Sequence, residues 1–159
     1  MRKSVLATLA IGIVSLGALA GAEGHISDKQ LETAVKSRQA HMQLYSFHLS
    51  TLGGMAKEEM AYDAAVAQTA ADSLAALASL SQAGYWLPGS DNESIEKTRA
   101  LPAIWAEGSD VGAKSEAFVA AVLAMQASAG TDVDALKAAM GPLGGACGAC
   151  HKDYRQSNN

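Results

Sequence analysis

Two runs of residues, spaced alternately by three and four positions, constrain the fold of this chain more than any other feature. The first run comprises Leu31, Val35, Arg38, Met42, Tyr45, Leu49 and Leu52. The second comprises Val133, Leu136, Met140, Leu143, Cys147, Cys150 and Tyr154. This spacing keeps one face of a helix turned toward partner helices. Because no stretch of strand length alternates polar and apolar residues, we expect an all-α fold without a sheet.

Start and stop signals divide the chain into four helices. The first helix is predicted to open at Ser27, an N-cap with Gln30 as its capping-box partner, and to end near Gly53-Gly54. The other three are predicted over residues 63–84, 109–130 and 131–156, the last capped by Thr131. A long connection, residues 85–108, holds a turn at 88–92 and at most a short helical turn. Four helices of this length predict an antiparallel four-helix bundle.

The N-terminus has the pattern of a secretory signal peptide. Arg2 and Lys3 precede an apolar run that ends in small residues, so we expect cleavage of residues 1–22 after Ala20 or Ala22. An uncleaved membrane anchor is the alternative, because the run approaches the lower limit for a span. The remainder, residues 23–159, is expected to form one domain with no stable membrane span.

The net charge narrows the class of binding partner, and the cysteine spacing bears on whether a disulfide would stabilise the fold. Removal of the leader takes the formal net charge from −4 to −6, because the leader contains Arg2 and Lys3 but no acidic residue. This charge argues against nucleic acid and anionic membranes, and it suits a basic patch on a partner protein. Export permits a disulfide, but Cys147 and Cys150 would close a very small loop and add little stability.

Two features do not fit a plain bundle. Arg38 lies on the apolar stripe of the first helix, where an unpaired charge is costly. The end of the last helix consists largely of small residues, namely Gly141, Gly144, Gly145, Ala146, Gly148 and Ala149. Each glycine weakens a helix by up to about 1 kcal/mol relative to alanine, and Pro142 favours a kink. A large flat ligand against this segment would supply the missing packing, whereas without one the segment would fray.

The stretch CGACH indicates the nature of that ligand. Cys147, Cys150 and His151 share one helix face, and C-x-x-C-H is the pattern of c-type haem attachment. A structural zinc site needs four ligands, and the histidines His41 and His48 lie off the first stripe, where we expect them to be solvated. A redox dithiol would begin a helix after a strand, whereas this pair ends a helix. The residues therefore favour a haem.

The chain resembles the class II c-type cytochromes, the cytochrome c′ group with its low-spin relatives. The resemblance rests on four helices, on CGACHKDYR close to the C-terminus and on RQAHM in the first helix. It implies one covalently bound haem c, a periplasmic location and one-electron exchange with redox partner proteins. Because the haem performs the redox chemistry, no enzyme activity is expected. The main alternative outside this family is a small exported bundle with a scaffolding role.

The resemblance also implies roles for individual residues. Cys147 and Cys150 would form the thioethers, and His151 would be the proximal iron ligand. Arg155, four residues after His151, matches the basic residue that many family members carry beside the proximal ligand. Arg38 would meet a haem propionate, which would explain its place on the apolar stripe.

Met42 decides between two functions. It matches the sixth-position residue of the family, which is an iron-binding methionine in the low-spin branch and leaves iron five-coordinate in the c′ branch. A thioether ligand stabilises ferrous iron and suits an electron carrier, which is the predicted function. An open distal face would instead favour binding of NO or CO. A methionine on a bundle stripe is, however, ordinarily core filler.

The remaining candidates are less specific. Tyr45 is expected to pack against the porphyrin or to cap its pocket. Trp86 and Trp105 either cover the haem edge or are ordinary half-buried aromatics. The weaker methionine candidates are Met55, Met60, Met125 and Met140. Family members often pair through their first two helices, and an alanine stripe on the second helix permits such a homodimer or else faces its own core.

Overall fold

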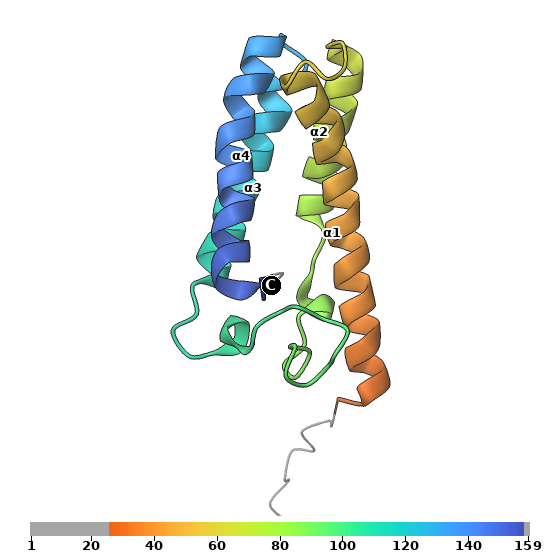
Figure 1. Ribbon diagram of the computed structural model, residues 1–159, viewed down its shortest axis with the longest axis vertical. Helices are drawn as coiled ribbons and strands as arrows, with labels where there is room; N and C mark the ends of the chain where they lie inside the picture. The colour runs from red at the N-terminus through yellow and green to blue at the C-terminus, as the bar shows by residue number, and fades with distance from the viewer. Residues whose placement is uncertain (1–25, 158–159) are drawn as a thin grey trace, which may run out of the picture.

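The fold is an antiparallel four-helix bundle (Figure 1). The computed structural model describes residues 26–157, so the signal peptide expected at residues 1–22 lies outside the described part. The helices are α1 (Asp28–Ala56), α2 (Ala64–Ser79), α3 (Val111–Ser128) and α4 (Val133–Tyr154), with short 3-10 helices η1 (Ala83–Tyr85) and η2 (Pro102–Trp105) between α2 and α3. Within residues 26–157 the only β-pairing is one isolated bridge. The all-α prediction is therefore confirmed.

The helix starts follow from local capping chemistry. Ser27 and Gln30 form the predicted capping box at α1, in which the Ser27 amide donates to Gln30 Oε1 at 2.8 Å. At α4, however, the cap is Asp132, whose carboxylate accepts from the Ala135 amide at 2.8 Å. The prediction of Thr131 was wrong by one residue. α2 ends at Ser79 instead of near residue 84, because the next residue adopts an extended backbone.

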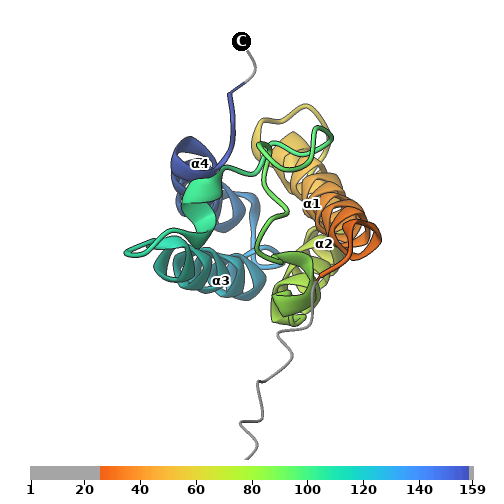
Figure 2. The ribbon, with the colours of Figure 1, turned by 90° about the horizontal axis from the view of Figure 1, so that it is seen from below.

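The four helices occupy the corners of a square, with α1 and α3 on one diagonal (Figure 2). The main core lies toward the end where α1 finishes and α4 begins, and its members come from all four helices. The larger ones are Leu52, Met55, Leu74, Val122, Met125, Leu136 and Leu143. Each such side chain contributes about 1.5–3 kcal/mol on burial. No helix within the described range is long and apolar enough to cross a membrane.

Small side chains let α2 approach its neighbours closely. Ala67, Ala70 and Ala71 are buried in the main core, and Ala75 and Ala78 pack against it. The alanine stripe therefore faces the core of its own bundle. This leaves the opposite face of α2 as the one available to a partner.

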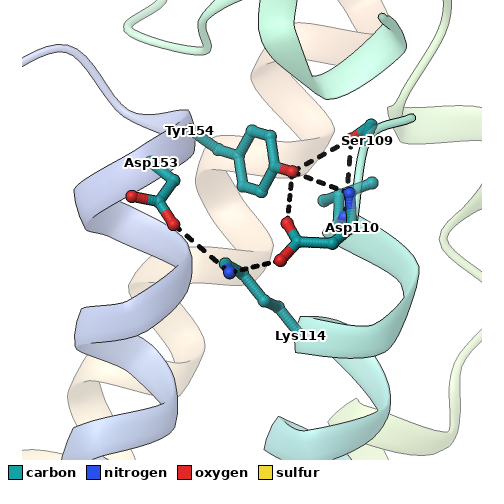
Figure 3. Close-up of polar contacts among 6 residues, drawn as sticks. Ser109, Asp110, Lys114, Asp153 and Tyr154 are labelled. Atoms are coloured by element: carbon teal, nitrogen blue, oxygen red, sulfur yellow. Dashed lines mark hydrogen bonds and ion pairs between the residues drawn. The ribbon is translucent and has the colours of Figure 1, made fainter. Parts of the chain in front are cut away.

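A polar cluster joins the end of α4 to the start of α3 (Figure 3). Tyr154 donates a hydrogen bond to Asp110 Oδ1 and accepts from the Asp110 amide at 2.9 Å and from Ser109 Oγ at 3.1 Å. Lys114 bridges Asp110 at 2.7 Å and Asp153 at 3.2 Å. Hydrogen bonds from Lys114 and Tyr154 hold the pKa of Asp110 below its ordinary value. The cluster anchors the last turn of α4, although the preceding turns of this helix have few large side chains that could pack against neighbours.

The connection between α2 and α3 crosses the same end of the bundle (Figure 2). It pairs with the chain that leaves α4, since the Leu101 amide donates to Tyr154 O at 3.0 Å and the Gln156 amide donates to Arg99 O at 2.8 Å. α4 thus remains an unbroken α-helix through Pro142 to Tyr154. The protein itself supplies part of the support that the glycine-rich segment needs.

Candidate haem site

The last two turns of α4 carry both cysteines and the adjacent histidine. Cys147, Cys150 and His151 are all half-buried, and neither cysteine is in a disulfide. Burial raises the pKa of both thiols, so they are protonated at neutral pH. A redox dithiol requires the opposite shift, toward a thiolate. The pair therefore suits an attachment role better than a redox role.

The glycines beside these residues leave an open flank on α4. A Cβ atom built on Gly144 or Gly148 meets nothing within 4 Å, and the same holds for Gly141 and Gly145. Gly144 and Gly148 precede His151 by seven and three residues, so they share its side of the helix. A flat group bound through the cysteines has room against this flank. The residues present therefore fit a covalently attached haem.

The contact between α1 and α4 sets the level of Met42 relative to His151. Gly53 on α1 lies against Met140 on α4, whose Cε is 3.7 Å from the Cβ position of the glycine. Met42 precedes Gly53 by eleven residues, and His151 follows Met140 by eleven. Eleven residues are three helical turns, about 16 Å along the axis. Because the helices are antiparallel, Met42 and His151 lie at one level on facing flanks.

Met42 is not core filler. Its side chain is 37% exposed, although it belongs to the stripe that buries Val35, Tyr45 and Leu52. α1 and α4 diverge from the end of the bundle where α1 finishes toward the end where α4 finishes (Figure 1). The apolar thioether of Met42 is thus partly exposed to solvent.

The other methionines lie elsewhere. Met55 and Met125 are buried in the main core, Met60 follows the end of α1, and Met140 packs against Gly53. Of the methionines within the described residues, Met42 is the one whose position fits an iron ligand opposite His151.

Arg38 is buried, with 4% exposure, and its charge is satisfied by the protein. Its guanidinium donates hydrogen bonds to the connection at residues 85–98 and lies 4.6 Å from the ring centre of Trp86. Desolvation lowers the pKa of Arg38, and the charge of Asp91 opposes that effect. The predicted reason for a charge on the apolar stripe was a haem propionate. The structure supplies a second reason, the connection itself.

His41 is a correction to the sequence analysis. Its side chain is only 5% exposed, its ring centre lies 4.6 Å from that of Tyr45, and its Nε2 has no partner within residues 26–157. Burial lowers the pKa of His41, and a hydrogen bond from its ring to the backbone of Leu77 partly offsets this. The stripe is centred on Arg38 and Tyr45, so position 41 borders it on the side of α2. His48, one heptad later, is half-buried.

Tyr45 on α1 packs against α3 and lies within electrostatic range of a cysteine on α4. It is 5% exposed, and its ring meets the edge of Phe118 on α3 at 5.0 Å between centres. The pKa of Tyr45 is raised to about 12. Burial is the main cause, a hydrogen bond from Gln82 opposes it, and the charge of Cys147 adds to it. Cys147 on α4 is thus within electrostatic range of the tyrosine.

Two arginines act electrostatically on His151. Burial lowers the pKa of His151 first, and Arg155 and Arg99 lower it further. A neutral imidazole is the form that binds a metal. Arg155 was expected from the family resemblance, whereas Arg99 was missed. No local pattern marks Arg99, because it reaches the site only through its hydrogen bonds to Gln156 O.

The tryptophans lie at the Cys150 end of the site. Trp86, Trp105 and Cys150 all pack against a small cluster formed by Ala100, Ile104 and Tyr154. Trp105 Nε1 donates to Trp86 O at 3.0 Å, which joins the two aromatic residues. Both are therefore half-buried side chains that share a small apolar cluster with Cys150.

Comparison with known proteins identifies the family. The family model described as Cytochrome C′ matches residues 33–155, which covers α1 from its second turn, all of α2, α3 and α4, and the C-x-x-C-H sequence. The chain belongs to the cytochrome c′ family. Membership shows one covalently attached haem c in a class II c-type cytochrome, a haem protein that carries electrons or binds gases. This cofactor agrees with the open flank of α4.

Individual relatives support the assignment. The chain is 41% identical to cytochrome c-554 from Cereibacter sphaeroides, over 99% of this chain and 100% of that protein. It matches a solved Rhodobacter cytochrome c′ with a TM-score of 0.78 and 35% identity, over 80% of this chain and 98% of that one. It also matches a ferrous variant of cytochrome c′ from Alcaligenes xylosoxidans with bound NO, with a TM-score of 0.70 and 31% identity, covering 80% and 97%.

Proposed function

We propose that this cytochrome is an exported one-electron carrier in which His151 and Met42 bind the haem iron. Cys147 and Cys150 are the proposed thioether residues. When bound, the haem c supplies the Fe(III)/Fe(II) couple. The observation that supports these two ligands is their equal spacing from the contact between α1 and α4. Met42 lies eleven residues from Gly53, and His151 lies eleven residues from Met140.

The surrounding residues suit this role. Two protein ligands that stay bound in both oxidation states keep the structural change on electron transfer small. The thioether of Met42 favours the reduced metal, as do the positive charges of Arg99 and Arg155 near His151. No protein side chain has to make or break bonds, so the proposal requires no catalytic residue.

The Met42→Leu variant tests the ligand assignment. Leucine conserves the apolar volume but cannot bind iron, so a low-spin ferric spectrum should become high-spin, with loss of the far-red thioether–iron band. Met140→Leu is the matched control, because Met140 lies three turns away against Gly53. A ferric spectrum of Met42→Leu identical to that of the unmodified protein would rule Met42 out as a ligand.

A gas-binding protein with unbound Met42 is the second candidate. The relative from Alcaligenes xylosoxidans with bound NO supports it, and so does the exposure of Met42. Carbon monoxide distinguishes the two functions in the unmodified reduced protein. A carrier with both positions filled should not react with CO, whereas a five-coordinate protein should bind it readily and show high-spin bands.

We also infer the processing and location of the protein. Residues 1–22 are proposed as a signal peptide and residues 23–159 as one periplasmic domain, on the basic start, apolar run and small-residue exit of the leader. The mass of the secreted holoprotein tests this and distinguishes cleavage after Ala20 from cleavage after Ala22. The net charge of −6 suits redox partner proteins with a basic docking patch.

A further inference from the structure

Arg38 uses most of its hydrogen-bonding capacity on one segment. Its Nη1 donates to Tyr85 O at 3.1 Å and to Ser90 Oγ at 3.0 Å. Its Nη2 donates to Ser90 O at 2.9 Å and to Thr98 Oγ1 at 2.8 Å. A guanidinium has five N–H donors, so these bonds leave only Nε without a partner within residues 26–157.

The acceptors of Arg38 are themselves removed from solvent. Ser90 and Thr98 are buried, as is Asp91, which supplies the nearest opposing charge. Loss of the guanidinium would leave buried oxygen atoms without donors, which costs more than the bonds contribute. The buried guanidinium and the buried oxygen atoms of residues 85–98 are therefore each other's hydrogen-bond partners.

The same segment extends to the cysteine end of the site. Trp86 lies under the Arg38 guanidinium and also packs against the cluster that Cys150 contacts. The carbonyl of Trp86 accepts from Trp105. A path of direct contacts thus joins the middle of α1, the connection and the last turns of α4.

We propose that Arg38 is a positioning residue that fastens residues 85–98 to α1 and so holds Trp86 at the Cys150 edge of the site. The inference rests on the proposed haem site, because its consequence is the shielding of that edge from water. Arginine is required, since the planar fork reaches four acceptors on one segment, whereas lysine offers a single point charge. Because the four Nη–H groups of Arg38 are already used, a haem propionate could accept a hydrogen bond only from its Nε.

The holoprotein variants Arg38→Lys and Thr98→Val test the proposal against a propionate role. Lysine keeps the charge and valine keeps the shape of threonine, so both remove hydrogen bonds of the fork, and Thr98→Val also removes the bond from the Ala100 amide to Thr98 Oγ1 at 3.2 Å. Both should speed amide exchange over residues 85–98, by about tenfold for Thr98→Val and by more for Arg38→Lys. Both should lower the midpoint potential, because water at the haem edge favours the oxidised charge. The double variant should show less than the sum of the two effects.

Gln39→Ala is the matched control. Gln39 neighbours Arg38 on α1 and donates to Lys97 O at 2.7 Å, but this contact with the same connection is exposed. The control should change neither exchange over residues 85–98 nor the potential. A potential that shifts in Arg38→Lys while Thr98→Val has no effect on either measurement would overturn the proposal in favour of a propionate contact.

The ferric spectrum separates this test from that of the proposed function. Arg38→Lys and Thr98→Val should keep the spin state of the unmodified protein, because neither residue binds iron. Failure of Met42 as a ligand would appear in the unmodified protein itself and would leave the exchange result intact. Failure of Arg38 would appear only in the exchange rates and the potential.

Discussion

At the scale of single residues, the site depends on side chains that are absent as much as on those present. Gly144 and Gly148 leave the His151 side of α4 open, although glycine weakens a helix. Helix stability alone would favour alanine at both positions, because an added Cβ meets no neighbour. The glycines are therefore best explained by the space they leave for the haem.

Replacement of Gly144 by leucine should separate helix stability from haem binding. The side chain would fill the flank beside His151, so the yield of covalently bound haem should fall, while the helix itself gains propensity. Haem per polypeptide, measured by absorbance and intact mass, is the readout. Gly145→Leu is the control, because residue 145 points away from the His151 side of α4. Equal haem yields in the two variants would contradict a role for the open flank.

At the scale of elements, the end of α4 is held by its neighbours. Tyr154 binds the start of α3 through Asp110 and Ser109, and its carbonyl accepts from Leu101 of the connection. These contacts explain why a glycine-rich helix continues through Pro142 to the turn that carries the proposed haem ligands. The tertiary contacts override the low propensity of the segment.

The Tyr154→Phe variant should lose much of this anchoring. It removes the hydroxyl that bonds Asp110 and Ser109, so the free energy of unfolding should fall by about 1–2 kcal/mol. Urea titration of the holoprotein measures the change. Tyr62→Phe at the opposite end of the bundle removes one bond, from the Tyr62 hydroxyl to Ala129 O at 2.9 Å, and should cost less. A larger loss in Tyr62→Phe would show that the α3–α4 cluster contributes little.

At the scale of the whole molecule, the outer face of α1 and α2 is the one suited to a partner. Phe47 is 66% exposed, and Leu44 and Val66 are also exposed there. The alanine stripe of α2, by contrast, is used by its own core. We therefore expect a homodimer to form through α1 and through the outer side of α2, as the family resemblance implies.

A charge at position 47 should disrupt such a dimer. Phe47→Asp places a carboxylate in the apolar patch, so the molar mass measured by light scattering should fall from that of a dimer to that of a monomer. The control Lys36→Asp changes the charge at an exposed site on α1, about two turns before Leu44, and breaks the ion pair with Glu32. A monomeric unmodified protein, or a dimeric Phe47→Asp variant, would contradict this interface.

The sequence by itself determined the elements and the chemistry of attachment. The 3-4 stripes, the cap at Ser27 and the glycine stop signals predict four helices because helix signals are local in the chain. The C-x-x-C-H spacing indicates haem attachment for the same reason, since its three residues share one helix face. These features need no knowledge of which helices become neighbours.

Only the tertiary structure decided how residues far apart in the chain meet. The Gly53–Met140 contact sets the register that brings Met42 level with His151, and no local pattern encodes that register. The burial of His41 and the four bonds of Arg38 were likewise hidden, because they depend on α2 and on the fold of residues 85–98. Packing between helices is a property of three-dimensional neighbours, so it appears only once the chain has folded.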